Sequence, residues 1–418
     1  AASVTSGKMG FRAWDGSGKF KNIQFQKRGE SLKNIEIPVF DRAVSGMWEA
    51  VARGTAEGAW DIDKTDPYTE NLNSTGAQSQ RITFESGAGA VGVNNMGLNR
   101  KGMNFEKDKN FEGYIYARSA GGADVYVVLE SADGGIQYGE AKLEVESGNG
   151  WKKYAFDITA DQKDAAGRMT VELRGAGTVD LGYAFMQPGE WGRYKGLPVR
   201  KDVGEKLEEQ NLSIMRFGGC MANAGDYKWK RMLGAPEDRP TYKGWWYDYS
   251  SLGFGIIEFL DLCEALGIVG VPDFNSYESA QDMADFMDFA TGTDETNEWV
   301  QKRIEMGHPE PYNLPYIEFG NEEKVDAGYA ARFNAMAPGV WERDEDIKLI
   351  VGEFGFGDVI TDPYNITGTA SGITTLAPHQ SMLELARENG RDVLFDVHIW
   401  TDNPGSCSNF VEVLSSLY

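Results

Sequence analysis

The chain has 418 residues, of which 41% are hydrophobic and 25% charged, a balance typical of folded domains and not of disordered chains. Its 41 basic and 64 acidic side chains give a formal net charge of −23, which excludes the neutralisation of nucleic-acid phosphate as its main task. No run approaches the roughly 18 apolar residues of a membrane span. The length predicts two or three domains, and the sequence predicts neither nucleic acid nor membrane as a partner.

Residues 1–40 have the alternating pattern of short β-strands. Apolar and polar residues alternate at 10–14 and 20–25, and Asp-Gly-Ser-Gly at 15–18 predicts a turn between two strands. The segment is too short to bury a core by itself. We therefore interpret it as the tail of a β-domain.

Residues 41–202 also read as β-structure, with almost no helical periodicity. Glycine and aspartate turns separate five short alternating runs, at 81–84, 113–118, 125–129, 153–156 and 169–173. Such spacing is typical of two packed antiparallel sheets. The sequence predicts one antiparallel β-sandwich over this range.

The pattern changes at residue 203, where strands and helices begin to alternate. Short apolar runs predict strands at 213–217, 268–275, 316–320, 347–351 and 393–400. Apolar residues at helical spacing predict helices at 256–266, 283–290, 326–337 and 378–389, the first of which ends at Gly267. Five such βα units predict a parallel sheet with chemistry at the carboxyl ends of its strands. A doubly wound sheet and a barrel both fit this pattern.

Polar side chains gather at the predicted strand ends, and the most informative segment is YIEFGNEE at 316–323. Hydrolysis of a glycosidic bond requires a carboxylic acid that protonates the leaving oxygen and a second carboxylate nearby. A partly buried strand end raises the pKa of such an acid. An ordinary acidic loop is the alternative, and Glu323 is expected to cap the following helix in either case. The 11 tryptophans of this acidic chain favour a carbohydrate-active protein, because sugars stack on aromatic faces.

Cysteine and histidine give no sign of a metal centre. Three cysteines and three histidines share no metal-ligand spacing, and they are Cys220, Cys263, Cys407, His308, His379 and His398. The Gly-x-Gly-x-x-Gly turn of dinucleotide-binding folds is missing. We therefore predict neither a metal nor a cofactor.

Five segments carry, in order, a resemblance to a known family. They are RFGGC at 216–220, KWKRMLGAPEDRP at 228–240, YSSLGFGIIEFL at 249–260, GHPEPY at 307–312 with EFGNE at 318–322, and DVHIW at 396–400. Together they resemble glycoside hydrolase family 51 of clan A, whose best-known members are retaining α-L-arabinofuranosidases. The first segment lacks the proline of the family's motif.

The resemblance implies roles for particular residues. Glu322 matches the family's acid/base, and Asn321 matches the asparagine that contacts the sugar near the reacting carbon. Arg216 is expected to pair with carboxylates beneath the site. Four further residues match positions at the family's sugar pocket: Asn275, His398, Trp400 and Cys220.

The resemblance also implies a multidomain fold. Residues 203–418 would form a (β/α)8 TIM barrel, incomplete in this chain because eight strands and helices take about 250 residues. Residues 41–202 resemble a carbohydrate-binding-like jelly-roll sandwich, and residues 1–40 resemble the tail of a laminin-G-like domain. The family's nucleophile lies on a strand after the histidine-bearing one, so we expect that glutamate beyond residue 418. Glu353 is an alternative second carboxylate, although its strand directly follows the acid/base strand, which favours a polar pocket or loop role.

The implied function is a retaining glycoside hydrolase that acts on plant cell-wall polysaccharide and releases α-L-arabinofuranosyl residues. An endo-β-1,4-glucanase or xylanase on the same framework is one alternative, and a non-catalytic carbohydrate-binding protein is another. The net charge of −23 suits a secreted or periplasmic enzyme acting on neutral glycans, although no signal peptide is visible. The sequence does not predict an oligomeric state.

Overall fold

The computed structural model describes residues 24–26, 29–34, 43–46, 48–68, 78–242, 244, 246, 250–354, 375–398 and 415. The contacts of the chain divide it into two compact units, Ala1–Ala43 and Val44–Tyr418. Among the described residues, we find no helix that is both long and apolar enough to span a membrane.

The first unit contains one pair of short strands. β1 (Gln24–Phe25) and β2 (Lys33–Asn34) run antiparallel, with Gln24 opposite Asn34. The strand expected at 10–14 lies outside the described residues. The assignment of residues 1–40 to the tail of a β-domain therefore stays a prediction.

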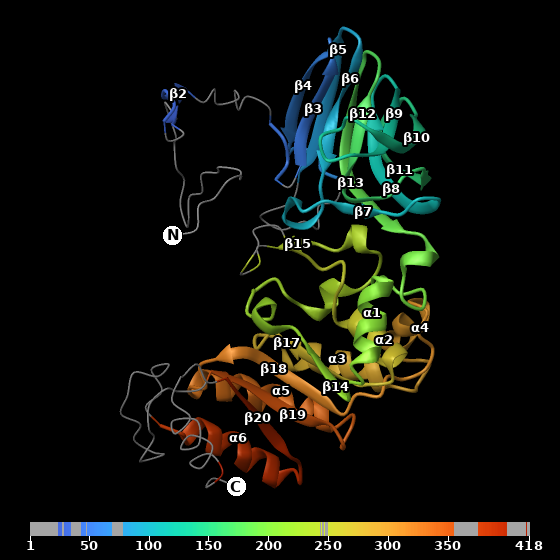
Figure 1. Cartoon of the computed structure of the whole chain (residues 1–418). Coiled ribbons are helices and arrows are strands. Elements are labelled where there is room, and N and C mark those ends of the chain that lie inside the picture. The colour runs from blue at the N-terminus through green and yellow to red at the C-terminus, as the bar shows by residue number, and fades with distance from the viewer. Residues whose placement is uncertain are drawn as a thin grey trace. The chain divides into compact units, whose positions relative to one another are not determined.

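Two antiparallel sheets form the first part of the second unit (Figure 1). One has the strand order β10-β9-β12-β6-β3, with β7 paired to β12, and the other has the order β11-β8-β13-β5-β4. The strands are β3 (Trp48–Gly54), β4 (Glu57–Asp63), β5 (Ser79–Ser86), β6 (Gly89–Asn95), β7 (Met103–Phe105), β8 (Lys109–Ser119), β9 (Ala123–Glu130), β10 (Gln137–Val145), β11 (Gly148–Ala160), β12 (Asp164–Leu173) and β13 (Gly177–Pro188). Two short 3-10 helices, η1 (Leu98–Arg100) and η2 (Glu190–Gly192), lie in the connections.

Alternation along the strands builds the core between these sheets. Val125, Val127 and Leu129 of β9 are fully buried and share a hydrophobic cluster with Ile115 of β8. All five runs predicted from the sequence lie within strands of the two sheets, so these predictions are confirmed. β6 escapes the sequence pattern because its segment, Gly-Ala-Val-Gly-Val-Asn-Asn, is rich in glycine and buried on both faces.

The second part of this unit is a parallel sheet with helices. Its strand order is β14-β17-β18-β19-β20, so neighbours in space follow one another along the chain. The strands are β14 (Ile214–Phe217), β17 (Val269–Phe274), β18 (Tyr316–Glu323), β19 (Lys348–Phe354) and β20 (Val393–His398). The helices are α1 (Lys201–Glu209), α2 (Ile256–Leu266), α3 (Ala280–Thr291), α4 (Glu298–Glu305), α5 (Ala327–Trp341) and α6 (Ala377–Glu388).

The predicted alternation of strand and helix is confirmed in the described residues. α2 ends, as predicted, at Gly267, which adopts a left-handed conformation with φ of 70° that favours glycine. The sequence does not predict α1 or α4, because both helices are short and mostly polar. The long connection from β14 to α2 contains η3 (Gly219–Met221), η4 (Trp229–Met232), η5 (Pro236–Asp238) and the hairpin of β15 (Thr241–Tyr242) with β16 (Ser250–Ser251).

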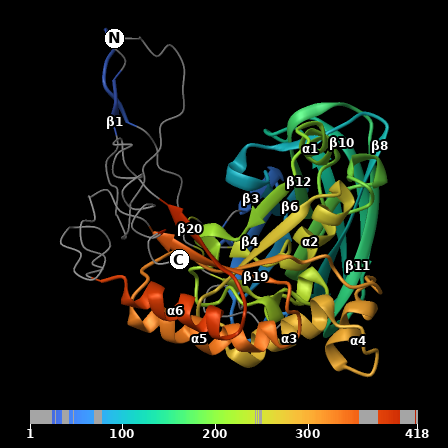
Figure 2. The ribbon, with the colours of Figure 1, turned by 90° about the horizontal axis from the view of Figure 1, so that it is seen from below.

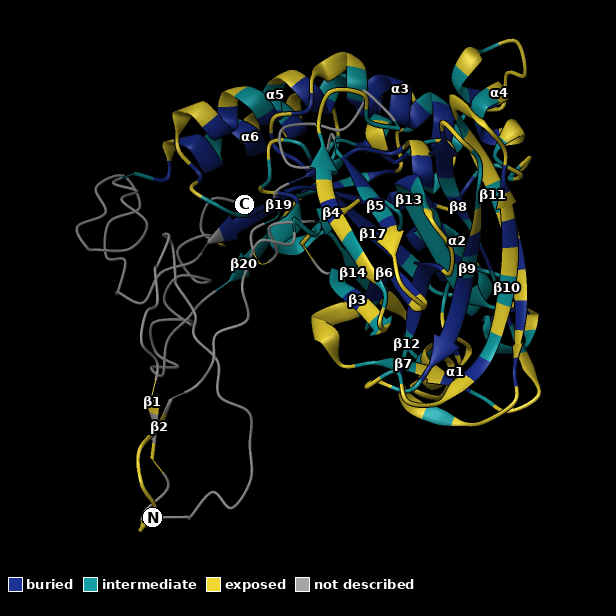
Figure 3. Cartoon of the chain, turned by 90° about the horizontal axis from the view of Figure 1, so that it is seen from above, coloured by how far each residue is buried: buried dark blue, intermediate teal, exposed yellow. Residues whose placement is uncertain are grey.

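Three helices cover one face of the parallel sheet. α3, α5 and α6 lie side by side along it (Figure 2). α5 and α6 each turn a buried stripe inward and an exposed stripe outward, whereas α3 is buried over most of its length (Figure 3). Phe286 of α3, Phe333 of α5 and Leu383 of α6 share one hydrophobic core with Val351 of β19. This core fixes the strands, and therefore also the positions of the polar side chains at their ends.

Candidate active site at the ends of the parallel strands

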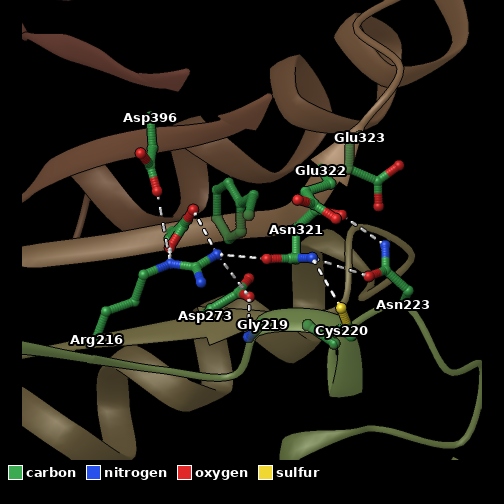
Figure 4. Close-up of polar contacts among 12 residues, drawn as sticks. Arg216, Gly219, Cys220, Asn223, Asp273, Asn321, Glu322, Glu323 and Asp396 are labelled. Atoms are coloured by element: carbon green, nitrogen blue, oxygen red, sulfur yellow. Dashed lines mark hydrogen bonds and ion pairs between the residues drawn. The ribbon is translucent and has the colours of Figure 1, made fainter. Parts of the chain in front are cut away.

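Arg216 lies among carboxylates from three other strands of the sheet (Figure 4). From β14, its Nη2 donates to Glu318 Oε1 of β18 at 2.9 Å and to Asp273 Oδ2 of β17 at 3.2 Å. Its Nε also donates to Glu318 and lies 3.6 Å from Asp396 Oδ2 of β20. The prediction that Arg216 pairs with carboxylates is confirmed.

One guanidinium therefore faces three carboxylates. Burial raises the pKa of Asp273 well above 3.8, and the nearby charge of Glu318 raises it further, while Arg216 opposes both effects. Burial also raises the pKa of Glu318 above 4.5, against the hydrogen bond from Arg216. The two buried carboxyls consequently hold protons at pH values where exposed carboxyls have lost them.

Asn321 is 3% exposed, and its neighbours fix the orientation of its amide. Its Oδ1 accepts a hydrogen bond from Arg216 Nη2 at 3.0 Å, and its Nδ2 donates to Asn223 Oδ1 at 3.3 Å. The same Nδ2 lies 3.9 Å from the sulfur of Cys220, which is a free, half-buried thiol. Asn223 in turn donates to the backbone carbonyl of Asn321 at 2.7 Å. The structure thus brings Asn321 and Cys220 together.

The backbone of β18 leaves the regular pattern of strand pairing around Asn321 and Glu322. Gly320 has a φ of 79° and Glu322 a φ of 51°, and the pairing with β19 shifts register between Phe319 and Glu323. A positive φ costs a residue with a side chain roughly 1–3 kcal/mol, and such strain concentrates at functional sites. The distortion gives Asn321 and Glu322 positions that a regular strand would not give them.

Glu322 lies beside His398, with 28% of its side chain exposed. His398 Nδ1 is 3.2 Å from Glu322 Oε1, and His398 Nε2 is 3.1 Å from Asp396 Oδ2. Burial lowers the pKa of His398, but the hydrogen bonds to Glu322 and Asp396 outweigh it and raise that pKa above 6.5. The imidazole therefore bridges two carboxylates, one of which also lies beside Arg216. The structure brings the predicted residues Glu322 and His398 into contact.

Asn275 holds the loop that follows β14. Its Nδ2 donates to the backbone carbonyls of Ala222 at 2.6 Å and Ala224 at 2.8 Å, and its Oδ1 accepts from Lys228 Nζ at 3.3 Å. Only 2% of Asn275 is exposed. Its amide is engaged by the chain itself, and contact with substrate stays a prediction.

Glu353 is turned away from this cluster. Its Oε1 lies 2.7 Å from Nε2 of His379 on α6, and both side chains are fully buried. Leu349 and Val351, which share its face of β19 by alternation, belong to the core beneath the helices. The structure therefore pairs Glu353 with His379 and not with Glu322. Trp400 lies outside the described residues.

The sequence analysis does not identify two residues of the candidate site, Asp273 and Asn223. Asp273 interrupts an apolar run two residues before Asn275. A carboxylate in a buried strand is rare unless it is paired, so Asp273 could have been predicted to belong to a charged site. Asn223 lies in an irregular loop and has no pattern that marks it. Both act on the site through Arg216 or Asn321.

The expectation that Glu323 caps the next helix is wrong. The N-cap of α5 is Asp326, whose side chain accepts hydrogen bonds from the backbone N–H groups of Gly328 and Tyr329. Glu323 instead accepts a hydrogen bond from Ser276 Oγ at 2.7 Å, because the distorted end of β18 turns it toward the neighbouring strand end.

Comparison with known proteins finds similarity to α-L-arabinofuranosidases. A family profile described as "Alpha-L-arabinofuranosidase 1 domain" matches residues 206–355. An extracellular exo-α-L-arabinofuranosidase of Streptomyces chartreusis is 28% identical over 327 residues, which cover 70% of this chain and 38% of that protein. The α-L-arabinofuranosidase 2 of Arabidopsis thaliana is 29% identical over 284 residues, which cover 63% of this chain and 41% of that protein.

A solved structure extends the likeness to the fold. An arabinose-bound family 51 α-L-arabinofuranosidase aligns with a TM-score of 0.64 at 20% identity, over 74% of this chain and 53% of that one. The chain spans less than half the length of the two relatives from Streptomyces and Arabidopsis. The profile match covers Arg216, Asn321 and Glu322. The chain is thus similar in sequence to α-L-arabinofuranosidases, and similar in fold to one of glycoside hydrolase family 51.

Proposed function

We propose that the protein acts as a retaining glycoside hydrolase that releases α-L-arabinofuranosyl residues from plant cell-wall polysaccharide. The observation that carries the proposal is the Asn321-Glu322 pair at the distorted end of β18, with Glu322 against His398 and Asn321 against Arg216. A partly exposed carboxyl beside a fixed amide is suited to protonate a glycosidic oxygen while the amide binds a sugar hydroxyl. The names of the relatives support the same activity.

In the proposed mechanism, Glu322 first serves as general acid. Its carboxyl proton passes to the leaving oxygen as a carboxylate nucleophile attacks the anomeric carbon and forms a glycosyl-enzyme. Glu322, now a carboxylate, then takes a proton from the water that releases the sugar. We expect the nucleophile on a strand that follows residue 418, because Glu353 is engaged by His379.

We further propose that the parallel sheet is part of a (β/α)8 barrel over residues 203–418. Its strands follow one another in chain order, as in a barrel, whereas a doubly wound sheet reverses its order at a switch point. The likeness of fold to the arabinose-bound enzyme supports this reading.

The finer domain assignments are proposals of the same kind. We assign residues 41–202 to a carbohydrate-binding-like jelly-roll sandwich and residues 1–40 to the tail of a laminin-G-like domain. We propose a secreted or periplasmic location, which the extracellular relative from Streptomyces supports. The proposed partner is a neutral polysaccharide or oligosaccharide.

A panel of substrates tests the activity in the complete gene product that contains this chain. Aryl α-L-arabinofuranoside, xylan and β-glucan are assayed together, and the anomer first released is identified by proton NMR. We expect release of arabinose with retained configuration. Cleavage confined to the xylan or β-glucan backbone would assign endo-xylanase or endo-β-1,4-glucanase activity instead. Binding without turnover of any substrate would assign a non-catalytic carbohydrate-binding protein.

A further inference from the structure

The sandwich has an aromatic face on the outer side of one sheet. Tyr114 of β8 and Tyr183 of β13 are stacked, with ring centroids 6.1 Å apart and an interplanar angle of 20°. Lys153 of β11 places Nζ 3.7 Å from the centroid of the Tyr114 ring. Aromatic rings arranged on an open sheet are a surface on which sugars stack, so the environment of this face decides what the sandwich does.

A carboxylate from the other part of the unit occupies this face. Glu237 of η5 is only 5% exposed, and it accepts hydrogen bonds from the hydroxyl of Tyr114 at 2.5 Å and from Lys153 Nζ at 2.7 Å. The hydroxyl of Tyr116 lies 3.4 Å from Glu237 Oε1, the oxygen that also accepts from Lys153. Tyr68 donates to the neighbouring Asp238 at 3.1 Å. Sandwich side chains therefore surround the η5 segment with donors.

The charge state of Glu237 fits this environment. Burial alone would raise its pKa, but the hydrogen bonds from Lys153 and Tyr114 outweigh burial and lower that pKa below 4.5. Burial and the hydrogen bond to Glu237 raise the pKa of Tyr114, so its hydroxyl stays a donor. An ionised, buried carboxylate that lost these donors would be strongly destabilised.

The segment that carries Glu237 also reaches the candidate active site. Beyond η5, Arg239 Nη2 donates to Glu258 of α2 at 2.6 Å. Before η5, Cys220 lies beside the Asn321 amide, and Asn223 donates to the Asn321 carbonyl. Residues 219–242 thus form one loop, anchored on the sandwich through Glu237 and lining the site through Cys220 and Asn223.

We propose that the sandwich is an intramolecular brace: its aromatic face binds Glu237 and so holds the 219–242 loop in place. This face is then not a binding surface for glycans. The chemistry that the face selects is a carboxylate flanked by an ammonium group and phenol hydroxyls, and Glu237 supplies it. The inference is independent of the proposed hydrolase activity.

Hydrogen exchange on the purified chain tests the brace. Glu237→Ala should speed amide exchange across residues 219–242 about tenfold, the effect of losing a charge-assisted contact that holds a local unit closed. Glu209→Ala is the matched control, because Glu209 is a carboxylate in an exposed pair with Lys206 on α1. That control should leave exchange in the loop unchanged.

A gentler variant keeps the test decisive if Glu237→Ala does not fold. Tyr114→Phe removes one hydroxyl and keeps the ring, and it should speed exchange in the same loop by a smaller factor, about threefold. Exchange that stays at the wild-type rate in a folded variant, or that rises only at residues 236–238, would overturn the brace.

Affinity electrophoresis through soluble arabinan and xylan tests the second part of the proposal. Because Glu237 occupies the face, Tyr183→Ala should leave the retardation of the chain unchanged in both polysaccharides. A loss of retardation in this variant, with wild-type loop exchange, would overturn the proposal and make the face a glycan-binding surface.

Discussion

Arg216 is the residue on which the candidate site depends most. It is one cation among Asp273, Glu318 and Asp396, and it also orients the amide of Asn321. Buried carboxylates that lose a paired cation are left poorly compensated, which costs far more than an exposed pair contributes. The stability of the parallel sheet and the geometry of the site therefore depend on one side chain.

Arg216→Met should lower the free energy of unfolding in urea by about 3 kcal/mol at neutral pH. The pKa values of Asp273 and Glu318 are already raised above 3.8 and 4.5, and loss of the cation raises them further. The deficit should therefore be small at acidic pH, where the carboxyls are protonated, and grow as pH rises. Arg231→Met, which removes the exposed pair with Asp226, should cost less than about 1 kcal/mol at every pH. Equal deficits in the two variants would contradict the role of Arg216.

His398 gives the site a pH dependence of the opposite sign. Its pKa is raised above 6.5 by Glu322 and Asp396, against burial and the charge of Arg216. The stabilisation from its charge is thus fully present below 6.5 and is lost as pH rises through the raised pKa. We expect the stability difference between wild type and His398→Gln, measured from pH 5 to 9, to shrink with rising pH. A difference that grows with pH would show that the imidazole is neutral in the folded protein.

The sequence predicts individual residues unevenly. Asn321, Glu322 and Cys220 could be singled out because they lie in short segments with a recognisable order, and the structure brings Asn321 to Cys220 and Glu322 to His398. The engagement of Asn275 by the loop and of Glu353 by His379 could not be foreseen. Both depend on which way a side chain points at a strand end, and a one-residue change of phase reverses that direction.

At the scale of elements, the end of β18 is built around close contact with β19. A Cβ on Gly352 would lie 1.8 Å from the carbonyl oxygen of Gly320 and 2.9 Å from Glu318 Oε1. Only glycine allows the two strands to approach there, and the approach accompanies the turn that places Asn321 and Glu322. A sequence pattern gives the strands but not this distortion, since it arises from pairing between them.

Gly352→Ala should therefore lower the free energy of unfolding by about 2 kcal/mol, because backbone atoms must move to admit a methyl group. Gly121→Ala is the control, since nothing lies within 4 Å of a Cβ at that position. Urea unfolding of both variants measures the difference. A Gly352 variant as stable as the control would mean that the two strands separate without cost.

At the scale of the whole molecule, alternation of period two and helical spacing were sufficient to predict the sandwich strands and the βα alternation. They do not predict how η5 meets the sandwich, because that contact joins Tyr114 to Glu237, 123 positions apart, through polar groups that any surface contains. The profile match and both relatives carry the name of α-L-arabinofuranosidase, and the chain spans less than half of the two relatives compared in detail. The activity of the whole protein therefore remains a proposal.

The most direct test of Glu322 as acid/base is the leaving-group dependence of Glu322→Ala in the complete gene product that contains this chain. Turnover of arabinofuranosides with poor leaving groups should fall by about 100- to 10,000-fold, while activated aryl arabinofuranosides, which need no proton, should be cleaved at rates much closer to wild type. Glu295→Ala, an exposed carboxylate, should leave both rates unchanged. Equal losses on the two classes of substrate would contradict the assignment of Glu322 as the general acid.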